Sequence, residues 1–263
     1  MCIEVVDGDV EDGSFIVGDI EDEELSDVSL IFCNGIANTR SDAIRKAGYI
    51  SEEFRGKHVF CRYNPTELLS WIITRFWSSL NRLKETKNDE SNAIVQNLAD
   101  RIFKELQKEN KRVLLIAHSH GVFIANRALK DKRLDAVRER IEVHAFAGAK
   151  IMKSDRAGRV WNYVCGSAII SHFANWIYHK KETFEIIKEL RLGRTCEEAA
   201  RNVVAKRNSA DGIEPLSEYE ECLRKAKKYN ISILPSRNWL SYRDHSLVTF
   251  LPEIRRIAQE CFP

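Results

Sequence analysis

The sequence has no uninterrupted apolar run of the roughly 20 residues that a membrane-spanning helix needs. Its two longest candidates, Leu68–Leu80 and Cys165–Tyr178, are broken by Arg75 or by other polar residues. The first thirteen residues, MCIEVVDGDVEDG, contain neither a basic region nor an apolar stretch, so they do not resemble a secretory signal. These absences predict a soluble, cytoplasmic protein.

The spacing of the cysteines and histidines predicts neither a disulfide framework nor a zinc site. The seven cysteines are an odd number, and no two of them form a Cys-x-x-Cys pair. Without a secretion signal this usage favours reduced, mostly buried thiols. The histidines do not cluster with the cysteines in the way that a zinc site requires. We therefore predict no metal and no cofactor.

Positive charge is absent from the first 39 residues, which carry eleven carboxylates and no Lys or Arg. The remainder then holds 41 basic and 28 acidic residues (39 less 11), a balance of +13. One interpretation is a solvated acidic arm over residues 1–27 and a mildly basic helical surface. The other is a basic body that attracts an anionic substrate, an anionic membrane surface or nucleic acid. Nucleic acid is the less favoured partner, because no recognition motif is present and no aromatic residues interleave the basic runs.

The chain also lacks repeats, low-complexity tracts and Pro/Gly/Ser-rich linkers, which favours one domain over residues 1–263. Apolar, β-rich runs alternate with helical patterns, which predicts an α/β fold with a mostly parallel central sheet and helices on both faces. The predicted strands are 28–33, 57–62, 112–117, 141–146, 160–165 and 231–235, and the main helices are 39–48, 66–85, 91–110, 121–130 and 247–260. A mainly helical insertion, residues 166–230, precedes the last strand, and Thr195-x-x-Glu198 and Ser217-x-x-Glu220 are typical of capping boxes.

The segment most indicative of function is Ala117-His-Ser119-His-Gly121, which follows the apolar run 112–117 and precedes a helical pattern. A strand that turns sharply into a helix forces the central residue of the turn into a strained conformation. Only small residues at the two flanking positions, here Ala117 and Gly121, permit that turn. The predicted result is a serine hydroxyl projected above the sheet at the positive end of the next helix.

With this segment the chain resembles the α/β-hydrolase superfamily, in its lipase and esterase branch, over residues 28–150 and again around 231–260. Ala117 replaces the glycine that the family usually has. The resemblance implies that Ser119 is the nucleophile and that the backbone amides of Ile36 and His120 form the oxyanion hole. The alternative for Asn34-Gly35 is a plain turn that ends a strand.

The same resemblance implies a histidine base after the last strand, and His245 stands there. The alternative is a surface histidine that caps the terminal helix. His118 and His120 are weaker candidates for the base, because the neighbours of the nucleophile point away from it. His58 and His144 lie within predicted strands and are interpreted as core residues with satisfied hydrogen bonds.

The acid of the triad has no clear position. Family members usually place it after the strand that here ends at Cys165, but no carboxylate follows before Glu182. Some relatives take the acid from one strand earlier, which would select Asp155. Asp244 adjoins His245 in the sequence, which is poor geometry for orienting the ring. A Ser119–His245 dyad without an acid is a further alternative.

The resemblance implies an ester hydrolase that forms an acyl-enzyme on a small-molecule or lipid ester. The insertion 166–230 would then be a lid over an acyl pocket, or alternatively part of the core. Because no acid is evident, the competing hypothesis is an inactive hydrolase-fold protein that serves as a binding or scaffold protein. An anionic membrane surface remains an alternative partner.

Overall fold

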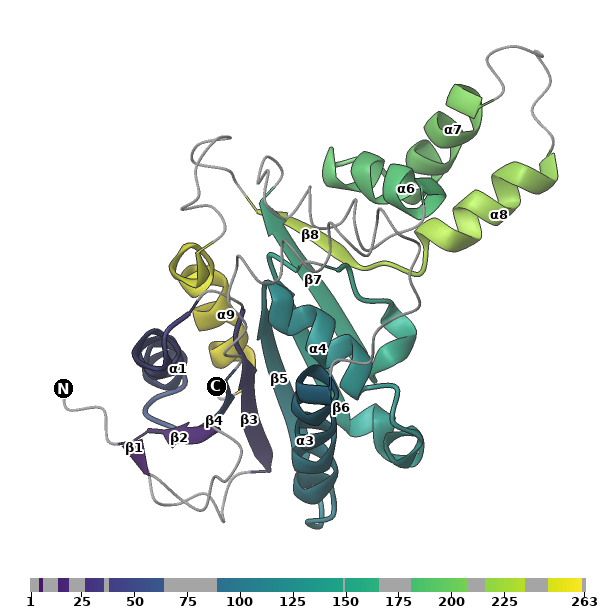
Figure 1. Ribbon diagram of the computed structural model, residues 1–263. Helices are drawn as coiled ribbons and strands as arrows, with labels where there is room; N and C mark the ends of the chain where they lie inside the picture. Colours follow the sequence, from purple (N-terminus) through teal and green to yellow (C-terminus); the bar gives the residue numbers. More distant parts are fainter. Residues whose placement is uncertain are drawn as a thin grey trace.

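The computed structural model describes residues 5–6, 14–18, 27–35, 38–63, 89–148, 150–165, 181–207, 216–234 and 246–261 (Figure 1). Within these residues eight strands form one sheet in the order β1-β2-β4-β3-β5-β6-β7-β8. The strands are β1 Val5–Val6, β2 Phe15–Val17, β3 Val28–Cys33, β4 Val59–Arg62, β5 Arg112–His118, β6 Ile141–Phe146, β7 Arg159–Cys165 and β8 Ile231–Leu234.

The sheet is mostly parallel, as the alternation of strands and helices predicts. Strand β2 pairs antiparallel with both β1 and β4, whereas every pair from β4 to β8 is parallel. Parallel strands bring their carboxyl ends to one edge of the sheet, so the loops after β3, β5 and β6 share that edge. The predicted α/β class is therefore confirmed. The predicted helix 66–85 lies outside the described residues.

Helices cover both faces of the sheet, which confirms the predicted layering (Figure 1). On one face, α1 (Arg40–Glu53) and α9 (Leu251–Cys261) pack on β3, β4 and β5 through buried residues such as Ile50 and Ile254. On the other face, α3 (Asp89–Leu106) and α4 (His120–Ala128) pack on β5 and β6 through residues such as Leu98 and Val122. Burial of these apolar side chains is the main force that holds the layers together.

Three further helices stand between β7 and β8, inside the predicted insertion. They are α6 (Lys181–Arg191), α7 (Cys196–Arg207) and α8 (Leu216–Ala226), and they extend beyond the β8 edge of the sheet (Figure 1). Together with Val164 of β7 they enclose a third buried apolar cluster, around Ile187, Val203 and Cys222. Thr195 and Glu198 form the predicted capping box, with each side chain accepting a hydrogen bond from the other residue's backbone N–H.

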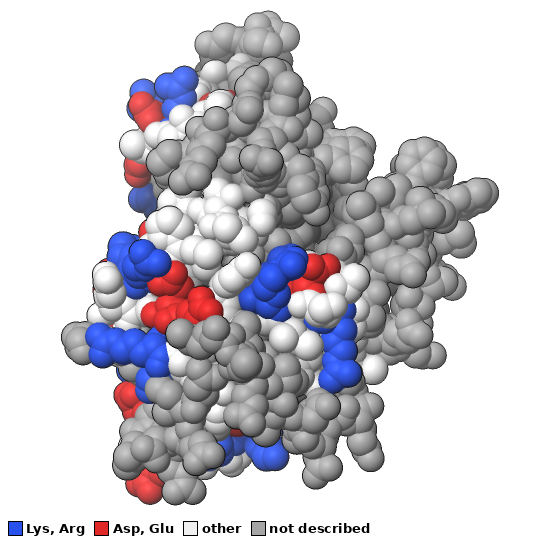
Figure 2. Space-filling view, turned by 90° about the vertical axis from the view of Figure 1, so that its left-hand side faces the viewer, with Lys and Arg blue, Asp and Glu red and all other residues white. Residues whose placement is uncertain are grey.

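The described surface on the side of α1 and α9 carries both signs of charge (Figure 2). The ion pairs on these two helices include Arg45–Asp42, Arg255–Glu53 and Arg256–Glu253. Exposed pairs of this kind contribute little to stability. Among the described helices, none is both long and apolar enough to cross a bilayer.

Candidate active site

Ser119 occupies a strained turn at the carboxyl edge of the sheet. It stands between β5 and α4 with φ 56° and ψ −122°, a conformation that residues with a side chain rarely adopt. Such a conformation costs on the order of 1–3 kcal/mol, so the surrounding structure must enforce it. One enforcing contact is the hydrogen bond of 2.9 Å from the Ser119 N–H to the carbonyl oxygen of Phe146, at the end of β6. Ser119 is half-buried, whereas His118 and His120 on either side are buried.

Gly121 shows why the turn needs small residues. A Cβ at this position would lie 2.2 Å from the carbonyl oxygen of Cys33 and 2.6 Å from that of Asn34. These are backbone atoms at the end of β3, and they cannot move without shifting the sheet. The start of α4 is therefore pressed directly against β3, and any side chain at position 121 would push it away. Ala117, the other flanking residue, is fully buried in the core between the sheet and helices α3 and α4.

The loop after β3 also reaches Ser119. A Cβ built on Gly35 would lie 2.8 Å from the Ser119 Cβ and 3.2 Å from its hydroxyl oxygen Oγ. The Asn34-Gly35 turn is thus brought against the serine, a position that the predicted oxyanion loop would need. Ile36 lies outside the described residues, so the part assigned to its amide remains a prediction.

His120 is the first residue of α4, so its backbone N–H lies at the amino end of the helix. Its side chain packs on Phe123 of the same helix, with ring centroids 5.3 Å apart. This arrangement suits the expected use of the His120 backbone. The part assigned to it in oxyanion binding also remains a prediction.

Cys33 is a second nucleophilic side chain near the turn among the described residues. It is fully buried at the end of β3, and this burial raises the pKa of its thiol to about 12, although Arg62 acts in the opposite direction. The thiol therefore stays protonated at neutral pH, and only a thiolate is strongly nucleophilic. Ser119 is consequently the better candidate for a nucleophile at this edge.

Asp155 lies at the opposite edge of the sheet, which corrects its assignment as the acid. It belongs to the short 3-10 helix η3 (Ser154–Arg156), where the Ser154 N–H donates to the carbonyl oxygen of Lys228, ahead of β8. The nearby Gly158 N–H donates to Arg138, ahead of β6. Both contacts are at the amino ends of strands, because the chain crosses back over the sheet between β6 and η3. The Asp155 carboxylate is exposed and pairs with Arg156 at 3.8 Å, away from Ser119.

No carboxylate is found among the described residues that directly follow a parallel strand at the edge of Ser119. Those residues are Asn34 and Gly35 after β3, Tyr63 after β4, Ser119 to Gly121 after β5, and Ala147, Gly148 and Lys150 after β6. His245 and Asp244 lie outside the described residues, so their relation to Ser119 also remains a prediction. In the part of the chain that the structure describes, no three His, Cys, Asp or Glu side chains are grouped to hold a metal ion.

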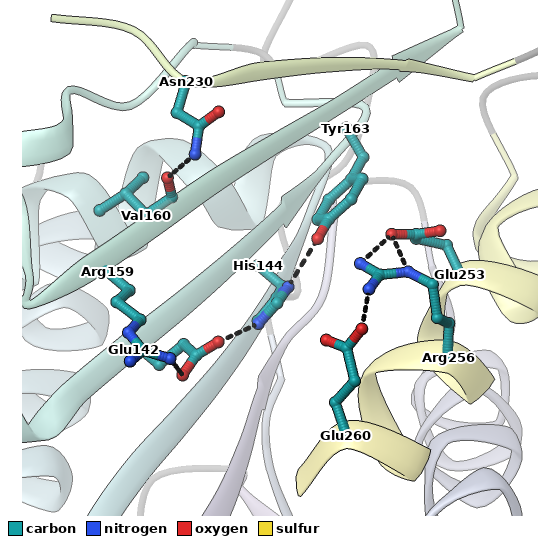
Figure 3. A network of polar contacts seen from close by, with 9 residues as sticks. All are labelled: Glu142, His144, Arg159, Val160, Tyr163, Asn230, Glu253, Arg256 and Glu260. Carbon is teal, nitrogen blue, oxygen red and sulfur yellow. Dashed lines mark hydrogen bonds and ion pairs between the residues drawn. The ribbon is translucent and has the colours of Figure 1, made fainter.

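A carboxylate, an imidazole and a hydroxyl do form a chain elsewhere, on the sheet face that α9 covers (Figure 3). His144 Nε2 lies 2.9 Å from the Glu142 carboxylate, and His144 Nδ1 lies 3.0 Å from the Tyr163 hydroxyl. A carboxylate only accepts hydrogen bonds, so Nε2 carries a proton and donates it to Glu142. Both ring nitrogens of His144 are thus satisfied in the core, which confirms the interpretation of this histidine. Its polar neighbours could not be identified from the sequence without knowledge of the strand register.

The comparisons with known proteins add no family to this geometry. No protein-family model matches the chain, and a search of curated proteins finds no match either.

Proposed function

We propose that this chain is a serine hydrolase of the α/β-hydrolase type that cleaves a carboxylic ester of a small molecule or a lipid. The observation that carries the proposal is the strained backbone of Ser119, at φ 56°, between a buried strand and a helix. Strain of this kind persists where the surrounding structure enforces it, and it is concentrated at functional sites. The nucleophile of this class sits on such a strand-to-helix turn.

In the proposed mechanism His245 accepts the proton of Ser119 as the serine oxygen attacks the carbonyl carbon of the ester. The amides of Ile36 and His120 stabilise the negative charge that develops on the carbonyl oxygen. Collapse of the tetrahedral intermediate expels the alcohol, which takes its proton from His245. A water molecule then hydrolyses the acyl-enzyme by the same steps in reverse order. The contact of Gly35 with Ser119 supports this assignment, because it brings the loop that precedes Ile36 to the reacting oxygen.

The test is labelling of the purified protein with a fluorophosphonate probe, which reacts with activated serines. The wild type should be labelled, Ser119→Ala should not, and His245→Ala should react at least about 100-fold more slowly, the usual contribution of a general base. Ser154→Ala and His58→Ala are matched controls, because Ser154 is exposed in η3 and His58 stands just before β4, both at the opposite edge. Labelling that survives in Ser119→Ala would reject Ser119 as the nucleophile.

A second candidate function is a binding or scaffold protein that keeps the fold without the catalysis. The absence of a carboxylate among the described residues that directly follow the parallel strands at the edge of Ser119 favours it. Loss of the acid slows a triad by a factor of about 10⁴. A folded wild-type protein that neither reacts with the probe nor hydrolyses p-nitrophenyl esters would support this second function over the first.

A further inference from the structure

Two asparagine side chains hold the carbonyl group of Gly35 beside Ser119. The Asn34 Nδ2 donates to the Gly35 oxygen at 3.0 Å, and the Asn38 Nδ2 donates to the same oxygen at 2.9 Å. A carbonyl oxygen has two lone pairs, so these two donors fill its accepting capacity. Asn34 is fully buried, which makes its bond to Gly35 costly to lose. The direction of the Gly35 carbonyl is therefore fixed.

Asn38 is in turn held from three sides. Its Oδ1 accepts a hydrogen bond from Lys46 Nζ on α1, and its backbone oxygen accepts one from the Tyr63 hydroxyl at 3.1 Å, just after β4. The next residue, Thr39, caps α1 in a capping box with Asp42. The loop is thus tied to a helix and to a neighbouring strand, and Lys46 reaches the Gly35 carbonyl through a single side chain.

The packing of Gly35 against Ser119 gives this hydrogen-bond chain a consequence for catalysis. A Cβ on Gly35 would lie only 2.8 Å from the Ser119 Cβ, so a shift of a few tenths of an ångström in the loop alters the surroundings of the serine. Fixing the Gly35 carbonyl therefore also holds Gly35 in place beside the serine hydroxyl proposed above to react.

We propose that Asn38 and Lys46 are positioning residues, which act with Asn34 through the Gly35 carbonyl to hold the Asn34-Gly35 turn against Ser119. The inference rests on the proposed function. Neither side chain touches the substrate in this scheme, so both should affect the chemical step more than substrate binding. No motif in the sequence indicates either residue, because Asn38 and Lys46 meet only when α1 folds back on the loop.

The test is hydrolysis of p-nitrophenyl butyrate by two variants. Asn38→Asp keeps the size of the side chain and the acceptor for Lys46, but it replaces the N–H donor with a carboxylate oxygen that repels the Gly35 carbonyl. We expect kcat to fall about tenfold with KM changed by less than about twofold. A displaced turn beside Ser119 should lower kcat less than the complete loss of an oxyanion donor would. Lys46→Met should lower kcat about threefold, and Lys46→Arg, which restores a donor, should recover most of it.

Arg45→Met is the matched control, because Arg45 is the exposed neighbour of Lys46 on α1 and should leave kcat unchanged. A merely structural role would lower the melting temperature without separating kcat from KM. Unchanged kcat in a folded Asn38→Asp variant of an active enzyme would overturn the positioning of the loop and leave the proposed function intact.

Hydrogen–deuterium exchange tests the same inference without activity. Peptides that cover residues 34–39 and the Ser119 turn should exchange faster in Asn38→Asp than in the wild type, and Arg45→Met should not change them. The wild type could be inert toward ester and probe while exchange is still faster in Asn38→Asp. That result would reject the proposed function but support the role of Asn38 in holding the loop. Equal exchange in an inert protein would reject both.

Discussion

The places that hold the Ser119 and Tyr163 hydroxyls differ in almost every physical respect. At the carboxyl edge, Ser119 has a strained backbone at φ 56°, is half-buried, and lies against glycine. On the α9 face, the Tyr163 hydroxyl bonds to His144, which bonds to Glu142 in an unstrained strand (Figure 3). Tyr163 is 1% exposed and stacks on Phe146 with ring centroids 4.6 Å apart.

The difference shows that the list of residue types does not identify a nucleophile. Glu142, His144 and Tyr163 have the composition of a catalytic triad, yet burial raises the pKa of Tyr163 and no substrate reaches an oxygen packed under α9. This chain of hydrogen bonds instead satisfies polar groups in the core. Buried polar groups without hydrogen bonds would lower the stability of the fold. No carboxylate is found among the described residues that directly follow the parallel strands at the edge of Ser119, but Ser119 has the partial exposure and the enforced geometry that its proposed role as a reacting oxygen requires.

The largest expected effect comes from breaking the turn at its tightest contact. Gly121→Ala places a Cβ at 2.2 Å from the Cys33 carbonyl oxygen, so the start of α4 must shift away from β3. We expect a loss of about 3 kcal/mol in the free energy of unfolding, measured by urea denaturation, together with loss of probe labelling. Gly148→Ala is the control, because its new Cβ would lie 3.0 Å from the Lys150 backbone oxygen, a less severe contact. This variant should lower the free energy of unfolding by about 1 kcal/mol. Equal losses in the two variants would show that the contact with β3 is not the constraint.

Relief of the strain at Ser119 should give a smaller effect of the opposite sign. Glycine adopts a positive φ without the steric cost of a Cβ, whereas alanine retains that cost. Ser119→Gly should therefore raise the free energy of unfolding by about 1 kcal/mol, after its greater freedom in the unfolded chain is subtracted, and Ser119→Ala should not. Both variants should lose probe labelling. Identical stabilities for the two would mean that no strain is stored at this residue.

The sequence predicts the elements of this fold better than it predicts their neighbours. Strands β3 and β6 have the expected bounds, because a buried parallel strand is a short apolar run that can be recognised locally. The turn at Ser119 is equally local, since its small residues are adjacent in the chain. By contrast, α1 continues to Glu53, past the predicted end at Gly48, because packing on the sheet overrides the glycine.

The error over Asp155 has a different cause. Its assignment assumed that the chain remains at the carboxyl edge after β6, whereas the contact of Ser154 with Lys228 carries it to the amino edge. Lys228 is far away in the sequence, so no local pattern indicates that contact. The link between His144 and Tyr163 depends in the same way on the register that sets Phe146 opposite Tyr163.

The smallest expected effect concerns pH and the hydrogen-bonded chain of Tyr163, His144 and Glu142. The hydrogen bond from His144 lowers the pKa of Glu142 below its usual 4.5, although partial burial opposes this shift. A carboxylate whose pKa is lower in the folded than in the unfolded state stabilises the protein above the unfolded pKa, and this contribution is lost as the pH falls through the folded value. Glu142→Gln should therefore be less stable than the wild type by about 1 kcal/mol at pH 7 and should approach it below pH 4, as measured by urea denaturation.

Probe labelling at pH 7 should be the same in Glu142→Gln and in the wild type, because the Glu142 carboxylate lies near the amino ends of the strands and Ser119 at their carboxyl ends. Glu253→Gln is the matched control for removing a carboxylate on this face, since Glu253 pairs with Arg256 on α9 rather than with His144. Its difference from the wild type should be smaller, because Arg256 also bonds Glu260. A loss of labelling in Glu142→Gln would mean that the hydrogen-bonded chain of Glu142 influences the reactivity of Ser119, so the two places would not be independent. A stability difference that persists at pH 3 would show instead that the carboxylate acts through packing rather than through its charge.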